Sequence, residues 1–300
     1  MICNKRIYFN VNSVGGGSSK PNKYTGEMQK KILIIDDHDD LETLLTGEFG
    51  KRGHLITTIE DRAKAVDLLE SEGFDLIVTD LDGEHLIAAK NGTDDNLSCL
   101  PADEPATRSN IKAFKLCISN YKKENFTEDE LKYFVATILN FKARCVDKKN
   151  LIQDWHEKIE FEVPSYVSLM QDILDYLMKR VEKSGVVNPE TSNLFVALDE
   201  AFVNAVKHGN KFNSEKLVRI TAEVSKEEAR FTIEDEGEGF NINEIPDPRN
   251  SENLFKTSGR GVLFIYNIMD EVRYNERGNR LTMIKKSERN LNRRDAETQN

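Results

Sequence analysis

The run LDEAFVNAVKHG carries four polar side chains at spacings that could form one functional helix face. Glu200, Asn204 and His208 follow one another at intervals of four residues, and Lys207 is three residues after Asn204. At this spacing all four side chains project from one side of an α-helix. Glu and Lys by themselves would fit the solvated face of an amphipathic helix. An Asn one turn after a Glu in so apolar a run instead indicates a binding or catalytic face.

A second candidate is the run DEGEGF, in which Asp235 directly follows a predicted strand. A carboxylate at a strand end can accept a hydrogen bond from the exocyclic amine of a base. Gly237 and Gly239 permit positive φ and let the backbone approach a ligand closely. A hairpin turn would explain the same glycines, so this run by itself leaves both interpretations open.

The run TSGRG places Gly259 and Gly261 immediately before a predicted helix. Glycines that open a helix leave its backbone N–H groups accessible at the positive end of the helix dipole, where phosphate groups bind. The run is therefore a candidate phosphate site, although such a glycine pattern is weak when taken singly.

In this order the three runs resemble the N, G1 and G2 boxes of the GHKL ATPase superfamily, over residues 158–286. The resemblance implies the cofactors ATP and Mg²⁺, with Glu200 as the catalytic general base and Asn204 as a metal ligand. It also implies that Asp235 reads the adenine amine and that residues 241–258 form a short lid. The ATP-binding residues that it implies are Asn204, Lys207, His208, Asp235, Gly237, Gly239, Gly259, Arg260 and Gly261.

Within this superfamily the chain looks closest to the anti-sigma-factor serine kinases. About fifteen residues separate the two predicted domains, too few for the long helical hairpin of a histidine kinase at about 1.5 Å of rise per residue. The runs EFEVPSYVSLMQDILDYL and GRGVLFIYNIMDEV carry the closer resemblance. It implies a serine protein kinase that phosphorylates a STAS-type antagonist protein and binds a sigma factor. The alternative is a non-catalytic, ATP-gated partner-switching module that sequesters a sigma factor, and a homodimer is left open.

Three carboxylates form a second constellation in the first half of the chain. Asp36 and Asp37 directly follow one apolar strand, and Asp80 ends another strand. The carboxyl ends of parallel strands meet at one edge of a sheet, so we expect these groups to converge. Three carboxylates repel one another unless a divalent cation neutralises them, and oxygen ligands suit Mg²⁺. Acidic residues that merely cap the following helices are the alternative interpretation.

The carboxylates and the order of the strands resemble the response-regulator receiver family, over residues 29–143. The resemblance implies Asp80 as the phosphoacceptor, Asp36, Asp37 and Asp80 as the metal site, and a cognate histidine kinase as phosphodonor. It implies control of the kinase by phosphorylation, as in two-component signalling.

The receiver family also carries a switch Lys and a hydroxyl residue. Lys123 is the best match for the switch Lys and Lys122 is its rival, while Thr107 is a candidate hydroxyl. Glu124 stands where the family has proline, and residues 84–110 are too rich in turn residues to place.

Composition excludes several classes of function. Lys and Arg number 42 against 52 Asp and Glu, and the net charge of −10 does not favour nucleic-acid binding. The chain has no apolar run long enough to cross a bilayer and no signal-peptide core, so we expect a cytoplasmic protein without membrane attachment. The four scattered cysteines form no CxxC pair and are expected to be idle thiols.

Hydrophobic periodicity indicates two domains, an α/β doubly wound sheet followed by an α+β sandwich. The resemblances imply that the first is a flavodoxin-like receiver and the second the ATPase domain. The predicted boundaries are a disordered leader at 1–28, the receiver at 29–143, a linker at 144–157, the kinase domain at 158–286 and a flexible tail at 287–300. Strands are expected at 31–35, 55–58, 75–79, 113–118, 159–163, 218–224, 230–234, 272–275 and 280–284. Helices are expected at 40–50 and 62–71, after a capping box at Thr127, after a cap at Ser165, from Pro189 to Gly209, and from Gly261.

Overall fold

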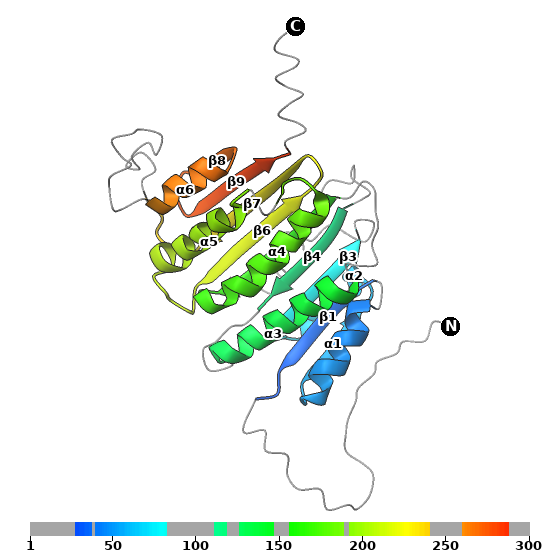
Figure 1. Ribbon diagram of the computed structural model, residues 1–300. Helices are drawn as coiled ribbons and strands as arrows, with labels where there is room; N and C mark the ends of the chain where they lie inside the picture. The colour runs from blue at the N-terminus through cyan, green and yellow to red at the C-terminus, as the bar shows by residue number, and fades with distance from the viewer. Residues whose placement is uncertain are drawn as a thin grey trace, which may run out of the picture.

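The strands of both halves of the chain lie in a continuous sheet. The computed structural model describes residues 28–37, 40–82, 111–118, 126–146, 156–188, 192–240 and 260–287. In these residues nine strands follow the order β2-β1-β3-β4-β5-β6-β7-β9-β8 (Figure 1). The two predicted domains therefore share one sheet.

The first three strands are parallel and follow the predicted doubly wound arrangement. β1 (Lys31–Asp36) lies between β2 (Leu55–Ile59) and β3 (Leu76–Asp82) and pairs with both. α1 (Asp40–Lys51) packs in the same hydrophobic cluster as the C-terminal half, whereas α2 (Arg62–Ser71) packs against the opposite face. β1 and β3 are covered on both faces, which explains their nearly continuous hydrophobic sequences, whereas β2 is half-buried.

The fourth strand departs from the receiver arrangement. β4 (Ile111–Cys117) runs antiparallel to β3 and parallel to β5 (His156–Pro164). The parallel doubly wound sheet expected for residues 29–143 therefore extends only through β3. One hydrophobic cluster contains residues of both halves, so the two halves share a core.

α3 (Glu128–Phe141) begins as its sequence predicts. Thr127 Oγ1 accepts a hydrogen bond from Glu130 N at 3.2 Å, and Thr127 N donates to Glu130 Oε2 at 2.7 Å, forming the capping box. One apolar stripe of the helix is buried, and a helical turn, η3 (Lys142–Val146), continues the helix into the predicted linker. The stripe consists of Leu131, Phe134, Val135, Ile138 and Leu139.

The C-terminal half is an antiparallel sheet covered by helices, as expected for an α+β sandwich. The helices α1, α3, α4, α5 and α6 lie on one face of the sheet (Figure 1). β6 and β7 alternate buried and less buried residues, with the buried face toward these helices. The elements after β5 are η4 (Val167–Leu169), α4 (Met170–Ser184), α5 (Leu194–Asn204), η5 (Ala205–Gly209), β6 (Leu217–Val224), β7 (Glu228–Asp235), α6 (Arg260–Ile268), β8 (Glu271–Tyr274) and β9 (Arg280–Lys286).

Two predicted helix starts need comment. Ser165 does not cap α4, because Leu169 holds the N-cap position and Ser165 Oγ donates to Lys216 O at 2.7 Å. Pro189 lies outside the described residues, and α5 begins at Leu194.

Three buried aromatic rings join the two halves. Phe114 on β4 lies 6.1 Å from Phe161 on β5 and 5.8 Å from Tyr176 on α4, measured between ring centroids. Phe161 and Tyr176 are also in contact, at 6.3 Å. All three are at most 2% exposed, so the N-terminal half contributes directly to the core of the C-terminal half.

Two further expectations can be compared with the described residues. None of their helices has both the length and the apolarity that crossing a membrane requires. Cys117 on β4 is disulfide-bonded, so the expectation of idle thiols is wrong for this residue.

We predict that Phe114→Ala lowers the free energy of unfolding by about 3–5 kcal/mol, because it removes a buried ring and leaves a cavity. Since the core is shared, the loss should appear in both halves. Urea denaturation followed by circular dichroism, with hydrogen exchange of β1 and β7, measures this. Leu55→Ala, at a half-exposed position on β2, is the control and should change stability by about 0.5 kcal/mol or less. Lost protection in β1 with unchanged protection in β7 would contradict a shared core.

Candidate active site

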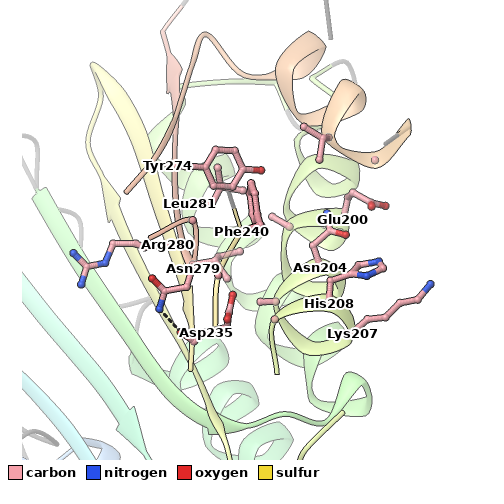
Figure 2. Close-up of a pocket in the computed structure, with 18 of the residues that line it drawn as sticks. Glu200, Asn204, Lys207, His208, Asp235, Phe240, Tyr274, Asn279, Arg280 and Leu281 are labelled. Carbon is pink, nitrogen blue, oxygen red and sulfur yellow. Dashed lines mark hydrogen bonds between the residues drawn. The ribbon is translucent and has the colours of Figure 1, made fainter. Parts of the chain in front are cut away.

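A cavity of about 620 Å³ lies between the α5–η5 helix and the β7–β9–β8 side of the sheet (Figure 2). Its volume is in the range of pockets that bind small molecules and cofactors. Of the residues singled out in the sequence, those that line it are Glu200, Asn204, Lys207, His208, Asp235, Gly239 and Gly261.

One wall of the cavity is the predicted helix face. Glu200 and Asn204 lie on the last turns of α5, and Lys207 and His208 lie on η5, a π-helical turn. Asn210 N donates to Ala205 O at 2.8 Å, which is the i+5 pattern of that turn. All four side chains border the cavity, so the prediction that they share one face is confirmed.

The opposite wall carries Asp235 at the end of β7. Gly237 N donates to Asp235 Oδ1 at 2.8 Å, which fixes one carboxylate oxygen. The Asp235 main chain is bound on both sides by Asn279, whose side-chain Nδ2 donates to Asp235 O at 2.7 Å (Figure 2) and whose carbonyl accepts from Asp235 N at 3.0 Å. Burial raises the pKa of Asp235, and the hydrogen bond from Gly237 opposes that shift.

Glycines allow the two walls to approach each other. A Cβ on Gly209, the last residue of η5, would lie 2.2 Å from Asp235 Cγ. A Cβ on Gly237 would lie 2.4 Å from Gly209 O. The Asp235 carboxylate therefore rests against bare backbone, which explains both glycines as conditions for this packing.

Glu200 lies against the first turn of α6. A Cβ on Gly261 would lie 1.7 Å from Glu200 Oε1, so a larger residue at 261 would require this carboxylate to move from its present position. α6 begins at Arg260, in agreement with the predicted glycine-opened helix. Gly259 lies outside the described residues, and the Arg260 side chain is not described.

The sheet side of the cavity also contains residues that the sequence did not reveal. Phe240 and Tyr274 form an edge-to-face pair with centroids 5.2 Å apart, and both line the cavity beside Leu281. Burial raises the pKa of Tyr274, so its hydroxyl stays protonated at neutral pH. Arg277 Nη2 donates to Gly237 O at 2.8 Å and ties the loop after β7 to the β8–β9 hairpin. Aromatic residues beside turns carry no spacing signal that could have predicted these positions.

The carboxylates of the N-terminal half are arranged differently from the prediction. Asp36 and Asp80 are register partners on β1 and β3, as their positions in the sequence suggested. Asp36 Oδ2, however, accepts hydrogen bonds from Leu41 N at 2.8 Å and Glu42 N at 3.0 Å, at the start of α1. Among the described residues there is no group of three His, Cys, Asp or Glu side chains that could hold a metal ion. Asp36, Asp37 and Asp80 do not form such a group in the part of the chain that the structure describes, and the predicted metal site stays a prediction.

Asp80 instead binds a lysine that the sequence analysis missed. Lys142 Nζ donates to Asp80 Oδ2 at 2.8 Å, and the two side chains are 1% and 9% exposed. Lys142 follows Ile138 and Leu139 by four and three residues, so its place on the buried stripe of α3 was the available signal. The predicted Lys123, its rival Lys122 and Thr107 lie outside the described residues.

Comparison with known proteins agrees with this site. Residues 163–285 match the histidine kinase-like ATPase domain family, which covers both walls of the cavity. The chain is also similar to serine-protein kinase RsbW of Staphylococcus epidermidis and of Staphylococcus aureus strain MSSA476. Each is 30% identical over 145 residues, which are 45% of this chain and 89% of the relative. The chain belongs to the family of these RsbW kinases, as the resemblance of residues 158–286 implied.

We predict that Gly209→Ala weakens ATP binding about 10- to 100-fold, the range expected when a hydrogen bond to a charged group is lost. The added Cβ cannot coexist with the present position of the Asp235 carboxylate. Isothermal titration calorimetry with ATP and Mg²⁺ gives the affinity. Gly47→Ala on α1 is the matched control, because nothing lies within 4 Å of its Cβ position. Equal ATP affinities in the two variants would show that the close packing of Gly209 on Asp235 is unimportant for binding.

Proposed function

We propose that the chain is an ATP-dependent serine protein kinase whose nucleotide site is the cavity between α5 and β7. The observation that supports this most directly is the convergence of Glu200, Asn204 and Asp235 on one cavity beside the glycine-opened start of α6. Membership of the RsbW kinase family points to the same activity.

The residues present fit Mg²⁺-ATP. The cavity has room for a nucleotide, and a carboxamide beside a carboxylate is an oxygen donor set that Mg²⁺ accepts. The bound nucleotide would supply the γ-phosphoryl group, and the cation would neutralise its charge. Asn204 would hold the metal, Asp235 would accept from the adenine amine, and the first N–H groups of α6 would face the phosphates.

Glu200 is the proposed general base. Its carboxylate lies where α5 and the start of α6 meet the cavity, so it can accept the proton of a hydroxyl that attacks the γ-phosphorus. In that step the serine oxygen forms the new bond to phosphorus, the bond to the β-phosphate oxygen breaks, and ADP leaves.

Glu200→Gln is expected to keep ATP affinity and to reduce phosphoryl transfer by about 10²–10⁴-fold. The glutamine side chain has nearly the same size and shape as glutamate but cannot act as a base. Asn204→Ala should instead abolish Mg²⁺-dependent ATP binding while the circular dichroism spectrum stays unchanged. Calorimetry and transfer from labelled ATP separate the two effects. Asp199→Asn, the neighbouring carboxylate on α5, is the control and should behave like the wild type. Transfer at the wild-type rate by Glu200→Gln would exclude Glu200 as the base.

The proposed substrate is a serine on a STAS-type antagonist protein, with a sigma factor as the second partner. This follows from the resemblance of the sequence to anti-sigma-factor serine kinases. Incubation with a purified STAS-domain protein and γ-labelled ATP should give phosphoserine on that protein. ATP-dependent binding of a sigma factor without any phosphoserine would favour the non-catalytic partner-switching module instead.

The N-terminal half is proposed to control the kinase through Asp80. Lys142 Nζ binds Asp80 and also lies 4.8 Å from the centroid of the Phe114 ring. Phe114 contacts Tyr176 on α4, and α4 packs against α5, which carries Glu200. A phosphoryl group on Asp80, supplied by a histidine kinase, would change the partner of Lys142 and so act on this chain of contacts. This route runs through packed side chains and does not need the linker.

We predict that acetyl phosphate or beryllofluoride with Mg²⁺ changes the transfer rate of the wild type by about 5- to 150-fold, the range of typical coupling free energies. With acetyl phosphate the Asp80 oxygen gains the phosphoryl group and acetate leaves. Asp80→Asn should not respond, and neither should the neutral pair Asp80→Asn/Lys142→Gln. Asp67→Asn on α2 is the control and should respond like the wild type. A wild type whose transfer rate is unaffected, although mass spectrometry shows phosphorylated Asp80, would contradict the coupling.

A further inference from the structure

Asn210 is a buried polar residue at the point where the two walls of the cavity meet. It directly follows η5 and is 1% exposed. Its Oδ1 accepts from Glu236 N at 2.8 Å, and its Nδ2 donates to Ser165 Oγ at 2.7 Å and to Leu217 O at 2.9 Å. Both amide hydrogens and the carbonyl oxygen are therefore used, each by a different segment of the chain.

These contacts fix the turn that carries Asp235. The N–H that Asn210 accepts belongs to Glu236, the next residue after Asp235, and the following residue, Gly237, donates to the Asp235 carboxylate. Gly209, the residue before Asn210, presses against the same carboxylate. Gly209 thus packs against the side chain of Asp235, and Asn210 binds the main chain directly after Asp235.

We infer that Asn210 is a positioning residue that gives the site its selectivity for adenine. The inference rests on the proposed role of Asp235 and extends it to a residue that does not line the cavity. Without the side chain of Asn210, the Glu236 N–H would lose its acceptor and the turn could rotate, so the carboxylate would no longer face the amine. Interactions with the triphosphate, which come from α5 and α6, would be unaffected.

Selectivity separates this role from a merely structural one. ATP carries an amine at the purine position where inosine triphosphate carries an oxo group, which Asp235 cannot accept from. The dissociation constant of inosine triphosphate divided by that of ATP, both measured with Mg²⁺ by calorimetry, reports the adenine contact. Asn210→Ala should lower this ratio about 10- to 100-fold, because the affinity for ATP falls while the affinity for inosine triphosphate stays the same. Hydrogen exchange of the Glu236 amide should become faster in the same variant.

Matched variants keep the test decisive. Asn213→Ala, in the same loop, removes an exposed side chain that accepts from Glu215 N, and it should leave the ratio unchanged. Ser165→Ala leaves Asn210 in place but removes the hydroxyl that its amide binds, so the ratio should fall by a smaller factor. If Asn210→Ala does not fold, the ratio measured for Ser165→Ala tests the inference instead.

Equal weakening of ATP and inosine triphosphate in folded Asn210 or Ser165 variants would overturn the inference and leave the role of Asp235 intact. A wild type that binds both nucleotides equally well would overturn the role of Asp235 itself, and the inference with it.

Discussion

Strand β4 is hydrogen-bonded along both edges, and the continuity of the sheet depends on these two ladders. Its antiparallel ladder with β3 joins it to the N-terminal strands, and its parallel ladder with β5 runs from Ile111 to Cys117. Without β4 the edge of β5 would expose unpaired N–H and C=O groups, which proteins generally cover. The pairing of β4 with β5 also brings Phe114 into contact with Phe161 and Tyr176 in the C-terminal half. The shared core is therefore a consequence of this strand pairing.

The cavity between α5 and β7 depends on a different constraint, the absence of side chains at three glycines where neighbouring segments approach closely. Gly209, Gly237 and Gly261 each lie so close to a carboxylate or a backbone oxygen that a Cβ would overlap it. Because these contacts join η5 to the turn after β7, and α5 to the start of α6, the positions of Asp235 and Glu200 are coupled to the backbone of their neighbours. A small displacement of any one of these segments should therefore move the carboxylates of Asp235 and Glu200 without disrupting the fold.

Local signals in the sequence predicted most elements and the helix wall of the site. The apolar stripe of α3, its capping box at Thr127 and the four-residue spacing of Glu200, Asn204 and His208 all depend on neighbouring residues, which a sequence displays directly. The direction of β4 depends on long-range pairing, and residues 84–110 before it gave no readable pattern. Asn210 and Asn279 were missed because a single polar residue has no periodicity. Lys142 was missed although it continues the apolar stripe of α3. The carboxylates at the ends of β1 and β3 were correctly placed, but position alone did not reveal that Asp36 caps α1 and that Lys142 binds Asp80.

The match to the ATPase family begins at residue 163, inside β5, so β4 and α3 lie outside the matched region. Yet these two elements pack directly on it. β4 supplies the strand beside β5, and α3 packs against α4 in the helix layer that ends at α6 (Figure 1). Lys142 connects three elements. Its side chain contacts Asp80 on β3 and Phe114 on β4, and its backbone is the C-cap of α3. Burying this ammonium is costly unless both partners remain in place. A change at Asp80 must therefore be accommodated by α3 or β4, and each of them touches the half of the molecule that holds the cavity.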